Sequence, residues 1–147
     1  RFKLSFVNEK GEDEQPVVIH RAISGSLERS IGIFIEHFAG AFPVWLSPVQ
    51  VAIVPVKPEL HNEFANQVLA SLKQNNIRVE LDDRNESLGK RIRAAKETKV
   101  PYVIVIGDKE KDSQKLTVET RGEKIENISV EEFVAKVTGE IKDRTLN

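Results

Sequence analysis

The fold is decided by residues 49–82, which read VQVAIVPVKPELHNEFANQVLASLKQNNIRVELD. We predict a strand over 49–55, a helix over about 61–75 and a second strand over 77–82. A strand, a helix and a strand of these lengths are typical of a βαβ unit, whose two strands run parallel in one sheet. The stretch therefore predicts an α/β protein.

The alternation continues toward the end of the chain with five further elements. They are a helix over about 87–99, a strand over 102–106, two short strands over about 115–120 and 124–128, and a closing helix near 130–142. The turn at Gly122 indicates that the last two strands form an antiparallel pair. We expect one mixed five-stranded sheet flanked by helices, formed by residues 48–147 alone, since roughly 100 residues suffice for such a core.

Residues 1–47 carry a different pattern. We predict two strands, over 2–7 and 16–22, and then a helix over about 26–39 that Gly40 ends. The apolar residues of this helix follow the i, i+4, i+7, i+11 spacing of one face, which we expect to be buried: Leu27, Ile31, Phe34 and Phe38. The proline-bounded segment that follows is typical of a packed connection between two bodies.

Composition limits the class of protein. The 147 residues are 39% hydrophobic and 31% charged, too apolar for disorder and too polar for a membrane protein. The 22 basic and 23 acidic side chains give a net charge of −1, so a nucleic-acid partner must be sought in local charge. The absence of cysteine excludes disulfides and thiolate metal sites. Because the sequence has no methionine and opens at Arg1 inside a predicted strand, we expect a fragment of a longer parent.

Three loops follow the predicted parallel strands: residues 57–60, 83–86 and 107–110. Ligands bind at the carboxyl ends of the strands in open α/β sheets, so we expect these loops to share one edge. Asn85 offers a donor and an acceptor, while ionised Glu110 only accepts, a pair that suits the Watson–Crick edge of an unpaired base. We expect these two residues at the ends of adjacent strands.

The predicted helix 87–99 carries five basic residues against the single acid Glu97: Lys90, Arg91, Arg93, Lys96 and Lys99. Its inward stripe is formed by Leu88, Ile92 and Ala95. A charge run is usually a solvated helix face. The alternative is a surface that contacts nucleic-acid phosphates beside the loop of Asn85, with Lys90 and Lys96 as the phosphate contacts.

Two features of residues 1–47 are candidates for chemistry. With Ser26 as N-cap, Arg29 occupies the N3 position, where a capping box prefers glutamate and where a cation opposes the helix dipole. Arg29 is then either a solvated arginine paired with a carboxylate or a group that holds phosphate beside the helix start. His20 lies on a predicted apolar strand, where a lone histidine is more often a core residue than a metal ligand.

Several motifs together resemble those of threonyl-tRNA synthetases. The stretches PVVIHRAISGSLER (16–29) and EHFAGAFPVWLSPVQV (36–51) resemble the end of the class II catalytic domain with its motif 3. Four shorter stretches resemble the anticodon-binding domain: DRNE (83–86), KRIR (90–93), VPY (100–102) and GDKE (107–110). The resemblance implies a catalytic-domain end over residues 1–47 and an anticodon-binding domain over 48–147.

The resemblance also implies roles for residues of the first part. His20 matches one of three protein ligands of a catalytic zinc, and the other two would precede Arg1. Ser26 matches a serine of the amino-acid pocket, and Arg29 matches the arginine on the ATP phosphates. A planar, always charged donor suits a triphosphate during adenylation.

In the second part, the family's anticodon-reading residues fall on three positions: Asn85, Arg93 and Glu110. Two positions depart from the family. Ser87 stands where relatives often have a basic residue, and Glu119 stands where they carry a base-contacting arginine. Glu119 cannot donate to a base or pair with a phosphate. Arg121, two residues along the same strand face, is the candidate substitute.

The implied parent is a cytoplasmic threonine–tRNA ligase that activates threonine with ATP and Mg²⁺, uses one Zn²⁺ and transfers threonine to tRNA(Thr). We expect it to be a homodimer joined through its catalytic domain, with no membrane partner. The fragment alone should bind the tRNA anticodon, hold no cofactor stably and lack catalysis. Two alternatives stay open: a synthetase-like RNA-binding or regulatory module without aminoacylation, and an α/β domain with a purely structural role.

Overall fold

The computed structural model describes residues 3–122 and 124–146. The chain forms two compact units that divide between Gly32 and Ile33, inside helix α1 (Leu27–Phe38). The domain boundary expected between residues 47 and 48 stays a prediction. Within the described ranges, no helix is both long and apolar enough to cross a membrane.

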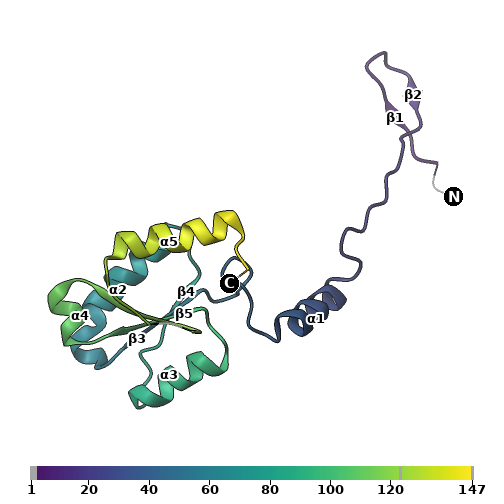
Figure 1. Ribbon diagram of the computed structural model, residues 1–147. Helices are drawn as coiled ribbons and strands as arrows, with labels where there is room; N and C mark the ends of the chain where they lie inside the picture. The colour runs from purple at the N-terminus through teal and green to yellow at the C-terminus, as the bar shows by residue number, and fades with distance from the viewer. Residues whose placement is uncertain (1–2, 123, 147) are drawn as a thin grey trace. The chain divides into compact units, whose positions relative to one another are not determined.

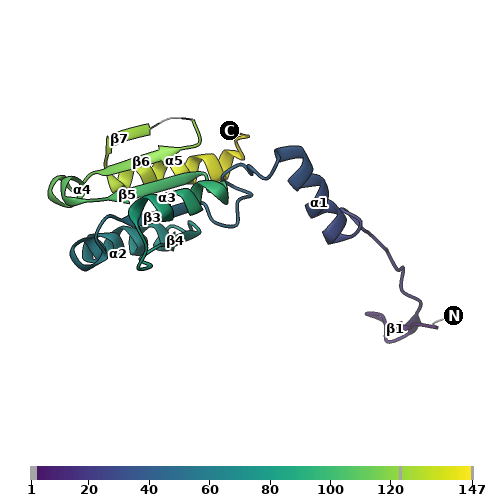
Figure 2. The same cartoon turned by 90° about the horizontal axis from the view of Figure 1, so that it is seen from below.

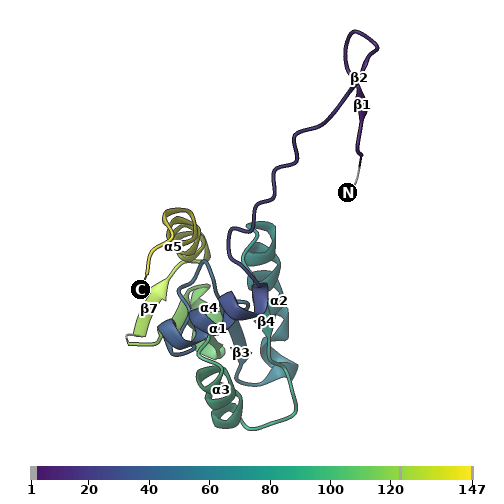
Figure 3. The ribbon, with the colours of Figure 1, turned by 90° about the vertical axis from the view of Figure 1, so that its right-hand side faces the viewer.

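The first unit contains a short antiparallel hairpin of β1 (Phe6–Val7) and β2 (Asp13–Glu14), seen from two sides in Figures 1 and 3. The strand predicted over 16–22 is wrong, because these residues form no strand. Pro16 gives a physical reason: it has no N–H with which to extend the ladder beyond β2.

Helix α1 begins and ends close to where the sequence predicts. The Ser26 hydroxyl accepts the Arg29 backbone N–H at 3.2 Å, as an N-cap does. Gly40 adopts φ +76° and its N–H donates to the Ile35 carbonyl at 3.0 Å, which closes the helix. The expectation that the apolar face is buried is wrong for this chain, since no residue of α1 is buried. An apolar stripe predicts that a face packs, but it does not say that the partner lies in the same chain.

The second unit is built on the mixed five-stranded sheet that the sequence predicts. Its strands are β3 (Val51–Pro55), β4 (Val79–Leu81), β5 (Tyr102–Ile106), β6 (Leu116–Thr120) and β7 (Lys124–Ile128). The order across the sheet is β4-β3-β5-β6-β7, as Figure 2 shows. Strand β3 pairs parallel with β4 and β5, while β6 pairs antiparallel with β5 and β7.

Helices cover both faces of this sheet: α2 (Pro58–Gln74), α3 (Leu88–Glu97), α4 (Asp108–Ser113) and α5 (Val130–Asp143). Helices α2 and α5 lie on one face and α3 lies on the other (Figure 1). All five residues of β3 are buried, as expected for a parallel strand covered on both sides. The core gathers apolar side chains of the sheet with those of α2 and α5, among them Phe64 and Phe133.

Two helix starts differ from the sequence prediction, and both lie at the strand ends. Helix α2 begins at Pro58 rather than near residue 61, because the fixed φ and missing N–H of proline suit the first helical position. The loop expected over 107–110 instead opens the short helix α4, whose N-cap is Gly107. Its charged sequence has no apolar stripe that would have revealed it.

Candidate nucleic-acid interface

The loops after β3, β4 and β5 lie on one edge of the sheet, as predicted. We call this the strand-end edge and define it as residues 56–60, 82–87 and 107–110. Parallel pairing aligns the three strand ends. The Val56 N–H donates to the Ile106 carbonyl at 2.7 Å, and the Asp82 N–H donates to the Ile53 carbonyl at 2.8 Å. Ligands of open α/β sheets bind at such an edge.

A hollow of about 600 Å³ opens in the strand-end edge between the loops after β3 and β4. These loops lead to α2 and α3 on opposite faces of the sheet, so they diverge (Figure 1). Asn85 lines the hollow and is exposed, and within the described ranges its side-chain amide has no hydrogen-bond partner. Three basic and three acidic side chains also line it: Lys57, Arg84, Arg91, Glu59, Asp83 and Glu86. Because these charges balance, the hollow suits the polar edge of an uncharged nucleobase better than a phosphate.

Arg91 forms part of the wall of this hollow and is only 2% exposed. Its Nη1 donates to the Asp82 carbonyl at 2.8 Å and its Nη2 to the Val56 carbonyl at 3.3 Å, so it joins the ends of β3 and β4. Its Nε has no partner in the described part of the chain. Arg91 is therefore not part of a solvated basic face. It holds in place the loop that carries Asn85.

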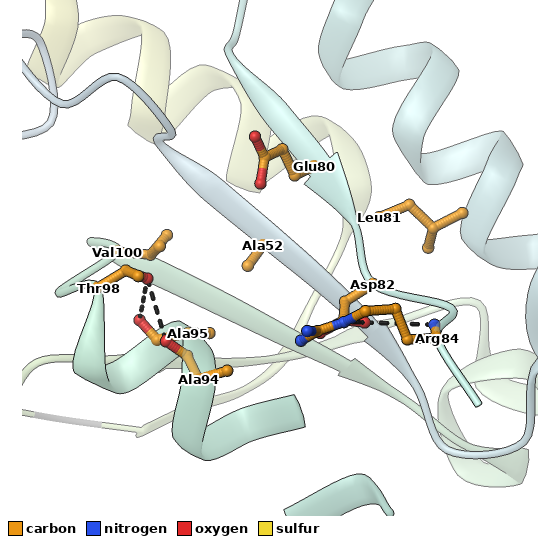
Figure 4. Close-up of a pocket in the computed structure, with 9 residues that line it drawn as sticks. All are labelled: Ala52, Glu80, Leu81, Asp82, Arg84, Ala94, Ala95, Thr98 and Val100. Carbon is orange, nitrogen blue, oxygen red and sulfur yellow. Dashed lines mark hydrogen bonds and ion pairs between the residues drawn. The ribbon is translucent and has the colours of Figure 1, made fainter. Parts of the chain in front are cut away.

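The loop after β4 is shaped by its own charges. The Arg84 guanidinium forks onto Asp82, with its Nε 2.8 Å from Oδ1 and its Nη2 2.7 Å from Oδ2 (Figure 4). These hydrogen bonds hold the pKa of the Asp82 carboxyl below its usual value. Farther along, Lys90 pairs with Glu86 at 2.8 Å. The predicted phosphate contact Lys90 is thus held beside the strand-end edge.

Glu110 is nearly buried, at 9% exposure, and both its oxygens are engaged. Oε2 accepts the Gly107 N–H at 3.0 Å and Oε1 accepts the Thr117 hydroxyl at 2.7 Å. Burial alone would raise the pKa of Glu110, but the hydrogen bonds from Thr117 and Gly107 outweigh it, and the pKa lies below its usual value. A carboxylate offers about four lone-pair sites, so these two hydrogen bonds do not use all of them.

The prediction that Asn85 and Glu110 stand at the ends of adjacent strands is wrong. Strand β3 lies between β4 and β5, because the crossover through α3 passes over it. Strands in a sheet are about 4.8 Å apart, so the two strand ends are separated by about 10 Å. The two residues share the strand-end edge, but Glu110 does not line the hollow of Asn85. They suit two neighbouring bases better than one.

His61 on α2 is the residue that directly follows the strand-end edge, and the sequence analysis gives it no role. It is 1% exposed, and its Nδ1 accepts the Lys57 N–H at 3.1 Å. Its Nε2 therefore carries the proton and donates to Asp108 Oδ1 at 3.0 Å. This bond holds the pKa of Asp108 below its usual value. His61 thus fastens the start of α2 to the start of α4.

The other basic residues of α3 are paired with acids. Arg93 pairs with Glu97 at 2.9 Å within the helix, and both side chains are mostly exposed. Lys96 pairs at 2.8 Å with Glu119 on β6. The basic face that the sequence predicts is thus largely neutralised in the chain by itself, and an anionic ligand must displace these acids to use it.

Arg121, the candidate substitute for a base-contacting arginine, is committed to backbone carbonyls. Its Nη1 donates to Phe42 at 2.7 Å, and its Nε and Nη2 donate to Lys99. Burial lowers the pKa of its guanidinium. Arg121 therefore fastens the segment after α1 and the end of α3 to the sheet. Its anticodon role stays a prediction.

A second hollow, of about 430 Å³, lies between the edge strand β4 and helix α3 (Figure 4). Its polar side chains are largely satisfied internally. Asp82 and Arg84 pair with each other, and the Thr98 hydroxyl donates back into its own helix. Glu80 is the remaining charged group that lines it. This hollow therefore offers a base fewer free donors and acceptors than that of Asn85.

The candidate residues of the first unit are exposed. Ser26 caps α1 and Arg29 follows one turn later, while His20 lies outside any helix or strand. Within residues 3–122 and 124–146, no three histidine, cysteine, aspartate or glutamate side chains gather to hold a metal ion. The described residues therefore do not fit a complete zinc site. The role of His20 as one ligand stays a prediction.

The fold and the strand-end edge define an α/β domain with a ligand-binding edge at the carboxyl ends of its parallel strands. The family model described as "Anticodon binding domain" matches residues 50–140. The chain belongs to this family.

Relatives and solved structures agree with this assignment. The chain is 50% identical over 145 residues to a threonine–tRNA ligase of Clostridium tetani and 45% identical over 148 residues to a threonine–tRNA ligase catalytic subunit of Sulfolobus acidocaldarius. These matches cover 98% and 100% of the chain, but the chain spans only 22% and 27% of the relatives' length.

Among solved structures, the RNA-binding domain of threonyl-tRNA synthetase from Cryptosporidium parvum gives a TM-score of 0.73 at 29% identity. That match covers 89% of the chain and 33% of the solved structure. A prolyl-tRNA synthetase from the same organism gives 0.68 at 23% identity, covers 95% and 31% of the two chains, and supports the fold alone.

Proposed function

We propose that the second unit binds the anticodon loop of tRNA(Thr) at the strand-end edge, as part of a longer threonine–tRNA ligase. The observation that carries this proposal is the exposed amide of Asn85, which has no partner among the described residues and lies in a hollow whose charges balance. Proteins read single-stranded RNA by splaying bases out and hydrogen-bonding their edges. The similarity to threonine–tRNA ligases supports tRNA(Thr) as the particular RNA.

We assign some residues to the RNA bases and others to the RNA backbone. Threonine anticodons end in G and U, so two neighbouring bases must be read. We assign one to Asn85 and the other to the remaining lone pairs of Glu110, about 10 Å apart as estimated from the strand spacing. Arg93 reaches the RNA after leaving Glu97, which costs little, because an exposed pair of this kind is worth about 0.3–0.5 kcal/mol. We assign a phosphate contact to Lys90.

The test compares two RNA stem-loops, one with a threonine anticodon and one altered in its last two anticodon bases. Asn85→Ala should cost about 1–3 kcal/mol on the first loop, the worth of a good base-edge contact, and should reduce the discrimination between the two. The matched control is Asn66→Ala, which removes an exposed asparagine on α2 whose side chain bonds only its own helix. Equal losses on both loops, or equal effects of the two substitutions, would refute base reading by Asn85.

For the longer protein, we infer that Ser26 lines the amino-acid pocket, that Arg29 contacts the ATP phosphates with Mg²⁺ and that His20 supplies one zinc ligand. These roles rest on the sequence resemblance. The longer protein would work as a cytoplasmic homodimer. There, Arg29→Ala should slow adenylate formation by about 2–4 kcal/mol in activation free energy, the scale of one lost transition-state donor. Unchanged pyrophosphate exchange would instead favour an RNA-binding module without aminoacylation.

A further inference from the structure

Three basic side chains of α3 form ion pairs, and one of these pairs differs from the other two. Lys90 and Arg93 pair with acids four residues away on the chain, and all four side chains are more than 40% exposed. Lys96 instead reaches Glu119 on strand β6, 2.8 Å away, and the Glu119 side chain is only 27% exposed. The acid that neutralises Lys96 is therefore fixed by the sheet.

The sheet register explains this placement. Glu119 pairs with Val103 across the β5–β6 ladder, and Val103 pairs with Ala52 across β3–β5. Cross-strand neighbours point to the same side of a sheet, so Glu119 lies on the face that α3 covers. A carboxylate on a paired strand loses less freedom in holding an ammonium than one on an exposed helix does. The pair with Lys96 is thus better organised than its surface neighbours.

The side chains around this ion pair include more basic than acidic groups. A hollow of about 410 Å³ is lined by four charged side chains, Lys96, Lys99, Arg121 and Glu119, and Glu119 is the single acid among them. Arg121 is committed to backbone carbonyls, and the Lys99 ammonium donates to the Ala39 carbonyl. Lys96 is therefore the cation lining this hollow whose carboxylate partner a phosphate can replace.

We propose that Glu119 takes the place of an RNA phosphate on Lys96 and so lowers the affinity of helix α3 for the RNA backbone. This inference rests on the proposed RNA binding. A phosphate must displace the carboxylate before it can pair with the Lys96 ammonium. Base reading at the strand-end edge then contributes a larger share of the affinity, which favours discrimination between RNAs over tight general binding. Glu119 is thus a specificity-determining residue that acts through Lys96.

The experiment is a double-mutant cycle on RNA binding over a series of salt concentrations. Glu119→Gln keeps the shape of the side chain and removes its charge, and it is made both in the natural sequence and with Lys96→Met. The probe is the stem-loop with a threonine anticodon. Glu131→Gln is the charge-matched control, since it removes one exposed acid from α5 on the opposite face of the sheet.

With Lys96 present, Glu119→Gln should steepen the log–log salt dependence by about 0.7, the value of one single-strand phosphate contact, so that binding is about fivefold tighter at about 0.1 M salt and unchanged near 1 M. With Lys96→Met, the same substitution should change neither quantity. Glu131→Gln should leave the slope unaltered. Urea unfolding of each variant verifies that all are folded.

Three results would overturn the inference. If the gain persists with Lys96→Met, Glu119 repels RNA directly and does not act through the lysine. If Glu119→Gln weakens binding, the carboxylate contacts the RNA itself. If affinity and slope do not change, the ion pair has no effect on binding. Failure of the proposed function is distinct from all three, because the natural sequence would then not bind the stem-loop with selectivity at all.

Discussion

Replacing Arg91 with methionine tests how the strand-end edge is held together. The substitution keeps an apolar stem and removes a guanidinium that is 2% exposed and bonded to the carbonyls of Asp82 and Val56. A hydrogen bond from a charged donor contributes about 1.5–3 kcal/mol, and two are lost. The substitution also removes the cost of burying a charge whose Nε has no partner in the described part of the chain, and this offsets part of the loss. We expect a net destabilisation of about 2–4 kcal/mol, a large share of the 5–15 kcal/mol typical of a domain.

The matched control is Arg93→Met, two residues along the same helix. Arg93 is 80% exposed and pairs with the exposed Glu97, so its loss should cost about 0.5 kcal/mol or less. Urea unfolding measures both, and with a slope of about 1–3 kcal/mol per M the midpoint of the Arg91 variant should fall by about 0.7–4 M. Equal midpoints for the two variants would refute the account of Arg91 as the residue that joins the ends of β3 and β4.

Two further predictions concern the titration of buried groups. Burial and the hydrogen bond to Glu140, at 2.7–2.8 Å, raise the pKa of Tyr102, the single tyrosine of the chain. Ultraviolet absorbance should therefore show that it ionises at higher pH than a free phenol, and Tyr102→Phe should cost about 1.5–3 kcal/mol of stability. Ionisation of Tyr102 at the pH of a free phenol would contradict the burial of this pair. The pKa of Glu110 is lowered in the folded chain, so its stabilisation is present above the unfolded value of about 4.3 and is lost as the pH falls through the lower folded value. Urea midpoints measured across this range should therefore fall less steeply with acid for Glu110→Gln than for the natural sequence, and parallel curves would show that the carboxylate is not specially stabilised.

The sequence predicts the sheet well because its buried strands are unambiguous. The apolar runs over 49–55 and 102–106 are too short for helices and are separated by helix-length segments, which leaves a parallel arrangement. The failures occur where a local rule outweighs apolar character. Pro16 stops the first hairpin, and Pro58 starts α2 earlier than the polar residues around it suggest.

The position of the site is predicted from the sequence, because the topology brings the strand ends together. The burial of two residues that hold the site in place is not predicted, for one shared reason. Arg91 lies with Leu88, Ile92 and Ala95 at the i, i+3, i+4, i+7 positions of the inward face of α3. His61 opens the buried stripe of α2 in the same way. Charge suggests solvent, whereas position predicts burial, and here position decides. The ion pair of Lys96 with Glu119 depends on which sheet face lies under α3, and helical spacing alone does not reveal that.

The most direct measurement of the central claim is a map of where the RNA contacts the protein. Backbone amide resonances of the labelled chain are followed by NMR as the threonine-anticodon stem-loop is added. Binding at the strand-end edge predicts the largest shifts at Lys57, Asn85 and Glu110, with smaller ones along α3 and none on the outer face of α5. Shifts confined to α5, or equal shifts with a stem-loop altered in its last two anticodon bases, would contradict the account.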